Sequence, residues 1–364
     1  MSSPSASRSE IAVVGAGIPG LAMALGLAHQ GLRVALVGPR SKPFAITSTQ
    51  PFDPRVYAIS SGSTALLQRL GVWARIDVTR TAAVDRMRVF GDGGEELSFD
   101  AYTATVERLA TIIEESELLR VLDAACDYQP SIVRVPSPLA TLDASSEGAR
   151  IGLADGSVLE VPLAIGADGA QSAVRAAAGI NTSTTLYGQT AVVAHFSCER
   201  PHLNVAWQWF CDEGVVALLP LPGSHVSLVW SAPDALAAEL MAMDSDELSA
   251  RVTERSGAAL GTLCAIGAAQ SFPLRLMTVD HLIGARVALV GDAAHVVHPL
   301  AGQGLNLGLQ DVAQLLDTLD EREAFRDLGD PVLLRRYERR RAEDVAMMRI
   351  TTDGLARLFG STNP

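Results

Sequence analysis

Two glycine-rich turns, one near each end of this sequence, carry residue types that could bind a large polar cofactor. The later turn lies in Arg286–Asn306, which reads RVALVGDAAHVVHPLAGQGLN. Asp292 follows an apolar segment, so its carboxylate can accept a hydrogen bond from a sugar-like hydroxyl. Gly302, Gln303 and Gly304 begin a predicted helix, whose free N–H groups and positive dipole end suit an anion. This stretch therefore predicts a cofactor site.

The earlier turn reads GAGIPG and spans residues 15–20, between a short apolar strand and a helix. Gly15 permits a tight turn, Gly17 permits close approach of the backbone to a pyrophosphate, and Gly20 permits close packing of helix on strand. The N-terminus of the helix would face the phosphates. We interpret this turn as a dinucleotide-binding motif.

The next strand ends without the acid that usually holds the adenosine ribose. The sequence there is LVGPR, with Gly38 at the position where Asp or Glu is expected. Either backbone or water holds the ribose, or the affinity for the cofactor is reduced. Arg40 either contacts the adenosine or is a solvated loop arginine.

A further motif, GADGAQSAVR at residues 166–175, lies between the other two. In chain order, GAGIPG is the first motif, GADGAQSAVR is the second and residues 286–306 are the third. Alone it would be an ordinary turn after an apolar strand. Its position between two nucleotide motifs makes Asp168 and Gly169 candidates for the same site, with Arg175 in the helix that follows.

Alternating strands and helices must position these motifs. The apolar patterns predict strands at 11–14 and 33–37, helices at 20–30 and 61–70, and one helix or two over 107–125. A β-meander is predicted over 133–163, a second β-rich block over 189–230, and helices at 244–256 and 331–359. This order favours a mixed α/β fold, in which a β-sheet domain is inserted into a Rossmann-like domain with a parallel sheet.

The predicted division has three parts. Residues 1–75, 101–180 and 276–320 form the cofactor domain, residues 76–100 and 181–275 form the β-sheet substrate domain, and residues 321–364 form a C-terminal helical segment.

Composition excludes several classes of function. The net charge of -12 argues against nucleic acid as a partner, since binding phosphates requires a basic face. The four cysteines lack metal-ligand spacing, so we expect free thiols in a reducing cytosol. His295 and His298 have suitable spacing but no acidic or cysteine partner nearby, so no metal site is expected. Residues 11–28 are uncharged, yet their glycines and proline fit a strand, turn and helix better than a signal peptide.

In this order, GAGIPG, DPRVYAIS (53–60), GADGAQSAVR and GDAAHVVHPLAGQGLN resemble the single-component FAD-dependent aromatic hydroxylases. More narrowly, DPRVYAIS, RPHLNVAWQWF, VVALLPLPGSHVSLVW and RRYERRRAED resemble the ubiquinone-biosynthesis hydroxylases. The resemblance covers almost the whole chain and implies a fold like that of p-hydroxybenzoate hydroxylase.

The resemblance also implies a reaction. NAD(P)H, visiting transiently, would reduce bound FAD, and O2 would then form a flavin C(4a)-hydroperoxide that hydroxylates a polyprenylated phenol. A cytoplasmic protein is expected, with a peripheral contact to the inner membrane or a biosynthetic complex as further possibilities. The sequence leaves open the oligomeric state, the ring position and the choice of NADH or NADPH.

By similarity, Arg55 would lie beside the flavin or its phosphates, Asp168 near the pyrophosphate and Asp292 on the ribityl chain. The flavin-facing loop would run along the isoalloxazine and contains Pro299, Gly302, Gln303, Gly304, Leu305 and Asn306.

The sequence departs from this family at Gly38 and at Glu115-Ser116, where an Asn-Arg pair is usual. Relatives also continue beyond the position of Pro364 with a short helical stretch. Three rival functions remain open: a flavin-dependent dehydrogenase or reductase, a flavin halogenase, and a cofactor-poor scaffold of a quinone-biosynthesis complex. The halogenase lysine and WxWxIP sequence are both missing.

Overall fold

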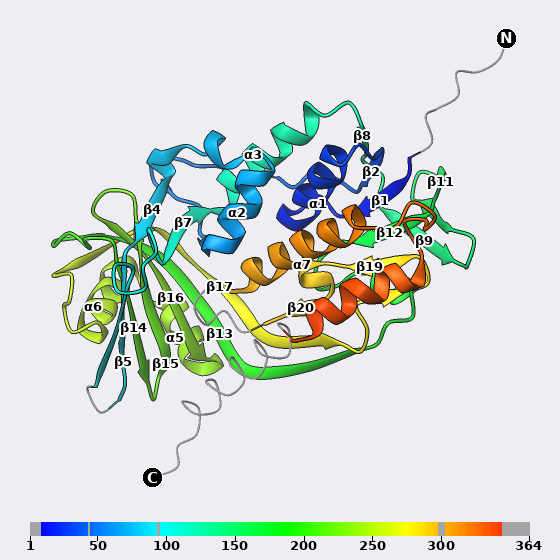
Figure 1. Cartoon of the computed structure of the whole chain (residues 1–364). Helices are drawn as coiled ribbons and strands as arrows, with labels where there is room; N and C mark the ends of the chain where they lie inside the picture. The colour runs from blue at the N-terminus through cyan, green and yellow to red at the C-terminus, as the bar shows by residue number, and fades with distance from the viewer. Residues whose placement is uncertain (1–8, 43, 93–94, 298–302, 344–364) are drawn as a thin grey trace.

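Two sheets at opposite ends of the molecule dominate the fold (Figure 1). The computed structural model describes residues 9–42, 44–92, 95–297 and 303–343. A six-stranded sheet carries the two outer sequence motifs at its strand ends, and an eight-stranded sheet forms the other end.

The six-stranded sheet is mostly parallel and buried on both faces. In spatial order its strands are β18 (Ile283–Gly284), β19 (Val287–Leu289), β12 (Leu163–Gly166), β1 (Ile11–Val14), β2 (Val34–Val37) and β8 (Ile132–Val135). The central strand β1 pairs in parallel with β12 and β2. Continuous apolar strands such as IAVV and VALV are what a sheet covered on both faces requires.

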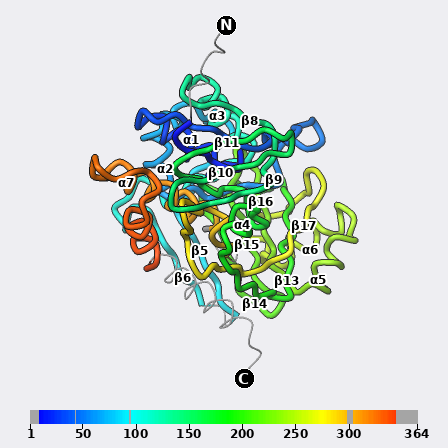
Figure 2. Tube along the Cα trace, turned by 90° about the vertical axis from the view of Figure 1, so that its right-hand side faces the viewer, coloured from blue at the N-terminus to red at the C-terminus, as the bar shows by residue number. Residues whose placement is uncertain are grey.

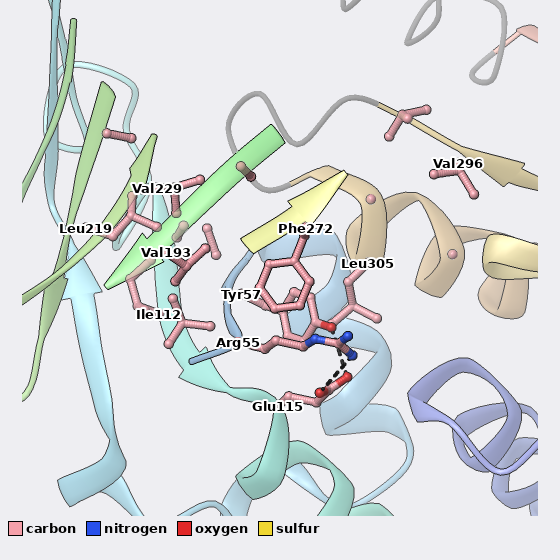
Figure 3. Close-up of a pocket in the computed structure, with 18 of the residues that line it drawn as sticks. Arg55, Tyr57, Ile112, Glu115, Val193, Leu219, Val229, Phe272, Val296 and Leu305 are labelled. Atoms are coloured by element: carbon pink, nitrogen blue, oxygen red, sulfur yellow. Dashed lines mark hydrogen bonds and ion pairs between the residues drawn. The ribbon is translucent and has the colours of Figure 1, made fainter. Parts of the chain in front are cut away.

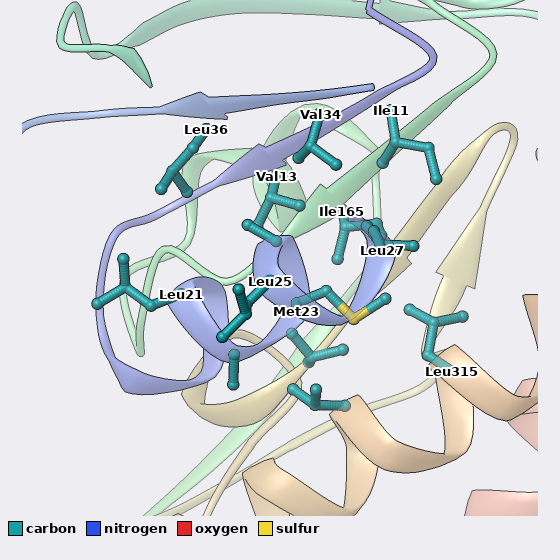
Figure 4. Packing of buried hydrophobic residues seen from close by; sticks show 14 of the residues in the cluster. Ile11, Val13, Leu21, Met23, Leu25, Leu27, Val34, Leu36, Ile165 and Leu315 are labelled. Carbon is teal, nitrogen blue, oxygen red and sulfur yellow. The ribbon is translucent and has the colours of Figure 1, made fainter. Parts of the chain in front are cut away.

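Helix α1 (Ile18–His29) packs between α3 (Glu115–Asp127) and α7 (Gln303–Asp320) (Figures 1 and 2). Figure 4 shows how its side chains, among them Leu21, Met23 and Leu25, fill the core beside β1 and β12. A Cβ on Gly26 would overlap the side chain of Leu316 of α7, so the glycine allows these two helices to pack closely. Residues 331–343 form a further helix, and the hydroxyl of Tyr337 donates to the carbonyl oxygen of Leu289.

Two predictions about the elements between β2 and β12 need correction. Residues 107–125 are not helical throughout: β7 (Ala110–Glu114) lies between β3 (Val56–Ile59) and β4 (Thr81–Val84) in a small antiparallel sheet. The pair Ile112-Ile113 favours a strand because β-branched residues fit a pleated surface. The predicted meander is also shorter, since β8 and β12 at its ends join the parallel sheet. Its three strands are β9 (Leu139–Ala144), β10 (Ala149–Leu153) and β11 (Val158–Val161) (Figure 2).

The eight-stranded sheet is the second large sheet of the fold. Its order is β20 (His295–Val296), β17 (Leu263–Val279), β13 (Thr182–Cys198), β16 (His225–Pro233), β15 (Gly214–Leu221), β14 (Val205–Cys211), β5 (Arg86–Phe90) and β6 (Glu96–Asp100). Helices α5 (Asp234–Ala242) and α6 (Ser245–Arg255) pack on one face of it around the buried Trp230. The remaining helices are α2 (Ser61–Arg69) and the short α4 (Ala173–Ala177).

Strands β13 and β17 are long and run from the eight-stranded sheet towards the six-stranded one (Figure 1). At that end β17 pairs with β20, which belongs to the later cofactor motif. The residue boundaries of the two domains stay a prediction. The β4–β7 pair crosses one of them, and strand β17 itself runs across another.

Three expectations about absences can be compared with the described residues. The cysteines at 126, 198, 211 and 264 are free thiols. No group of three potential metal ligands occurs among the residues that the structure describes. Over the same residues, no helix combines the length and apolar character needed to cross a membrane.

Replacing Gly20 with alanine should destabilise the fold strongly. A Cβ there would overlap the carbonyl oxygen of Gly15 and approach Ala167. We expect a loss of about 3 kcal/mol in the free energy of unfolding, at the upper end of overpacking costs, measured by urea denaturation.

The matched control is Gly17→Ala, because a Cβ on Gly17 meets no atom within 4 Å. Its expected cost is below about 1 kcal/mol, the usual scale for a helix N-cap. Equal stability of the two variants would contradict the proposed packing of helix on strand.

Candidate active site

The three sequence motifs meet at one end of the parallel sheet. A Cβ on Gly15 would overlap the carbonyl oxygen of Ala167, so the first and second motifs approach each other through their backbones. A Cβ on Gly291 would lie 3.1 Å from Cγ of Pro19, and one on Gly308 would lie 3.0 Å from Cα of Gly291. The third motif therefore packs directly on the N-terminus of α1.

A buried carboxylate fixes the third motif. Asp311 on α7 has no exposed surface. Its Oδ2 accepts hydrogen bonds from the backbone N–H of Gly291 at 2.9 Å and from Nε2 of His295 at 2.7 Å. Its Oδ1 accepts from Nε of Arg341 at 2.7 Å. One side chain thus joins the loop after β19 to α7 and to the helix at 331–343.

The second motif is held by its own polar residues. The carboxylate of Asp168 accepts hydrogen bonds from the hydroxyl of Ser172 and from the backbone N–H groups of Ala173 and Val174, at the start of α4. The guanidinium of Arg175 donates to the carbonyl oxygen of Ala293, in the third motif. In this structure Asp168 therefore shapes the turn, and Arg175 links two motifs.

A cavity of about 640 Å³ extends from this junction into the eight-stranded sheet. At one end it is lined by the motif residues Gly17, Gly169, Asp292, Gly304 and Leu305. At the other end it is lined by mostly apolar side chains of β13 to β16, including Val193, Ala217, Leu219 and Val229 (Figure 3). The cavity therefore joins the nucleotide motifs to an apolar compartment.

The first turns of two helices open onto the motif end of the cavity. Gly17, Ile18 and Pro19 line it from α1, whose N-cap glycine provides no side-chain cap. Gly304 and Leu305 line it from α7. Uncapped N–H groups and two positive dipole ends attract an anion such as a pyrophosphate. Gly17 and Gly169 also leave open the space that a Cβ would fill, so these residues fit a bound dinucleotide.

Asp292 lines the same end of the cavity. Its side chain is open to the cavity, yet the surrounding protein displaces enough water to raise the pKa of its carboxyl above the ordinary value. His295, Arg275 and Arg55 oppose this rise through their charges. A carboxylate in this position can accept hydrogen bonds from ligand hydroxyls.

Arg55, Tyr57 and Glu115 form a cluster at the cavity wall (Figure 3). The carboxylate of Glu115 accepts hydrogen bonds from the Tyr57 hydroxyl at 3.1 Å and from NH1 of Arg55 at 3.4 Å. The guanidinium also lies over the ring of Phe272, 5.0 Å from its centroid. Burial and the charge of Glu115 raise the pKa of Tyr57, so its hydroxyl stays protonated and acts as a donor.

Buried polar contacts position this cluster. The carboxylate of Asp53 accepts hydrogen bonds from the N–H groups of Arg55 and Ser116, which ties the DPRVYAIS segment to the start of α3. The Asp53 N–H donates to Glu114, which also pairs with Arg80. Nε2 of His195 donates to the Asp53 carbonyl oxygen and so helps to hold this segment in place.

Several predicted site residues have other contacts in the structure. Arg40 is paired with Asp123 and Asp127 of α3. Asn306 accepts a hydrogen bond from the N–H of Ser60 and donates to the carbonyl oxygen of Ala58, which joins α7 to the β3–α2 turn. Pro299, Gly302 and His298 lie outside the described residues, and Gln303 is described only as the first residue of α7.

Gly38 has a φ of +118°, a conformation that other residues avoid. A side chain at this position would strain the observed backbone conformation. Whether Gly15, Gly17, Gly20, Arg40, Arg55 and the other predicted residues contact a cofactor stays a prediction.

Sequence reasoning missed some cavity residues. Tyr57 lies in the DPRVYAIS segment, in which the resemblance implied a role for Arg55 but none for Tyr57. Glu115 was named only because an Asn-Arg pair is usual at that position in the family. Phe272 and Arg275 lie on β17, which no motif marks, although Arg275 is one of two arginines in the cavity wall. Gln208 lies on β14 between two tryptophans, and no motif marks it. Alternation along β14 could have placed Gln208 and Trp207 on opposite faces.

Comparison with known proteins agrees with this geometry. A family model described as FAD binding domain matches residues 8–350. The 3-demethoxyubiquinol 3-hydroxylase of Escherichia coli K12 is 35% identical over 94% of this chain and 88% of its own length. The chain belongs to the ubiquinone-biosynthesis hydroxylase family. Membership makes it an FAD-dependent aromatic-ring monooxygenase, and the resemblance found in the sequence is confirmed.

Other relatives extend the family match. Ubiquinone hydroxylase UbiL of Rhodospirillum rubrum is 34% identical over 97% of this chain and 82% of its own. The structure of pqsL, a probable FAD-dependent monooxygenase from Pseudomonas aeruginosa, superposes with a TM-score of 0.83 over 97% of both chains, at 24% identity. At this identity the likeness shows the fold alone, and it confirms the predicted fold class.

Replacing Asp311 with asparagine should destabilise the protein. The change removes the charge of the carboxylate that pairs with the buried Arg341, and losing one partner of a buried pair costs about 3–5 kcal/mol. Urea denaturation of the protein without cofactor measures this directly.

Asp317→Asn is the control, because Asp317 lies on the same helix but pairs with Arg69 at the surface. Exposed pairs contribute about 0–1 kcal/mol. A similar small loss in both variants would show that the Asp311 contacts do not organise the fold.

Replacing Glu115 with glutamine should tighten FAD binding. Among the residues that the structure describes, Arg55, Arg275, Glu115 and Asp292 are the charged residues of the cavity lining, so their formal charges cancel. Removing one carboxylate frees Arg55 and favours an anionic ligand. An exposed pair is worth up to about 1 kcal/mol, which predicts roughly a fivefold lower Kd, measured by flavin fluorescence quenching.

Glu117→Gln is the matched control, since Glu117 lies on the same helix and pairs with Arg120 without lining the cavity. Its Kd should equal that of the unchanged protein. Weaker FAD binding by Glu115→Gln would mean that this carboxylate supports the cofactor rather than competing with it.

Proposed function

We propose that this chain hydroxylates the aromatic ring of a polyprenylated phenol in ubiquinone biosynthesis, with FAD, a reduced nicotinamide and O2. The observation that carries the proposal is the single cavity that joins the three nucleotide motifs to an apolar compartment. The names of the relatives, including ubiquinone biosynthesis monooxygenase COQ6 of Mus musculus at 35% identity, support the pathway.

The proposed cofactor position follows from the charges and the open space at the motif end. The pyrophosphate would lie at the N-terminus of α1, near Gly17. The ribityl hydroxyls would lie beside Asp292, and the isoalloxazine along Gly304 and Leu305. FAD bound there would supply the redox chemistry and the activation of O2.

The chain's own residues would position the reactants and exclude water. The dipole ends of α1 and α7 favour negative charge at the motif end. Val193, Leu219 and Val229 offer apolar contacts to a phenol ring and keep water out of the compartment. Tyr57 keeps its proton and holds Glu115, which in turn positions Arg55. A polyprenyl tail partitions into lipid, so we also propose a peripheral membrane contact.

Two rival functions predict different results in binding and activity measurements. A dehydrogenase or reductase would oxidise the reduced nicotinamide without transferring oxygen. A scaffold would bind no FAD. The packing of the three motifs and the open cavity beside them favour FAD binding over the scaffold. Gly17 and Gly169 line this cavity, and side chains at these positions would narrow it.

The test uses purified protein with FAD, a reduced nicotinamide, a short-chain prenyl phenol and isotopically labelled O2. We expect consumption of nicotinamide and O2 in equal amounts, with one labelled oxygen atom in the product. Nicotinamide oxidation without label in the product would favour the dehydrogenase. Absence of flavin binding after reconstitution would favour the scaffold.

A further inference from the structure

The apolar end of the cavity contains a buried amide side chain, that of Gln208. The cavity-lining residues of β14, β15 and β16 are apolar except for Trp207, Gln208 and Ser231. Gln208 is only 5% exposed. No described residue donates a hydrogen bond to its side-chain amide or accepts one from it.

The strand register shows which way Gln208 faces. It lies opposite Ala217, which lies opposite Val229, which in turn lies opposite Val193. Residues directly opposite one another share a face of the sheet, and all four line the cavity. Figure 3 shows Val229 and Val193 on this wall.

The side chain of the preceding residue, Trp207, and those opposite it point to the other face of the sheet. Trp207 lies opposite Leu218, and Leu218 opposite Leu228, and these three side chains pack in the core beneath α5 and α6. Because successive residues of a strand alternate between faces, Gln208 is directed into the cavity.

A buried amide without a partner is costly unless water or a ligand satisfies it. Its carbonyl oxygen accepts and its NH2 group donates, so it complements an aromatic hydroxyl, which does both. The surrounding alanine and valine side chains offer the ring only apolar contacts. Gln208 is therefore the group on this wall best suited to bind a polar substituent of an aromatic ring.

We propose that Gln208 binds the ring hydroxyl of the phenolic substrate and thereby determines which ring carbon faces the flavin. The inference rests on the proposed function, because it assigns the substrate's orientation within that site. Gln208 would act as a specificity-determining residue, since a single directional contact in an apolar compartment fixes the rotation of a planar ring.

The experiment compares two probes, a short-chain prenyl phenol and the same prenyl benzene without the hydroxyl. Dissociation constants are measured with the FAD-loaded protein, from the change in flavin absorbance. We expect the unchanged protein to prefer the phenol roughly tenfold, and Gln208→Leu to lose this preference, as removal of a buried hydrogen bond predicts. The variant should also give a mixture of ring positions among its products.

Ser227→Ala is the matched control. Ser227 has a fully buried hydroxyl without a partner on β16, in the same sheet, but it does not line the cavity. It should keep both the tenfold preference and the ring position. Equal FAD affinity in all three proteins, measured separately, shows that the cofactor site is intact.

Two outcomes would overturn the inference in distinguishable ways. If the unchanged protein discriminates between the probes and Gln208→Leu discriminates equally, the assignment of Gln208 is wrong while the proposed function stands. If the FAD-loaded unchanged protein binds neither probe, the proposed function fails and the role of Gln208 fails with it.

Discussion

The buried carboxylate of Asp311 is the contact on which the cofactor end of this protein depends. It binds the backbone at Gly291, the side chain of His295 and the guanidinium of Arg341, all without exposure to water. These partners come from a loop and from a helix far apart in the sequence. Since a charge of this kind is stable in a protein interior only when it is paired and hydrogen-bonded, the three segments must assemble together.

Once that loop is fixed, close backbone contacts determine the shape of the site. Gly291 packs on Pro19 and Gly308, and Gly15 packs on Ala167. These contacts bring two helix N-termini to one cavity and leave room beside them. The positive ends of the helices then provide the attraction for an anion that the neutral side-chain lining does not. Within that lining, the pairing of Arg55 with Glu115 limits how strongly the site attracts negative charge.

The eight-stranded sheet supplies a different environment in the same cavity. Its inward rows are apolar and rigidly spaced by strand pairing, so they can enclose a ring and exclude water. Strands β13 and β17 extend to the motif end, and β17 pairs there with β20. The wall of the apolar compartment and strand β20 of the later motif are thus parts of one hydrogen-bonded sheet. This continuity sets the position of Gln208 relative to the cofactor motifs.

The sequence by itself determined the three motifs, the parallel sheet, the inserted β-sheet and the family. Such features can be recognised from short segments. The spacing of Gly15 and Gly20 next to an apolar strand, for example, indicates a nucleotide-binding turn without reference to distant residues. It did not determine β7, the pairing of Asp311 with Arg341, or the orientation of Gln208. Each of these depends on partners distant in the sequence: β7 is a strand because β3 and β4 flank it, and Gln208 faces the cavity because α5 and α6 cover the other face of its sheet. Only the tertiary structure decides such contacts, since no local pattern records which distant residue will be the partner.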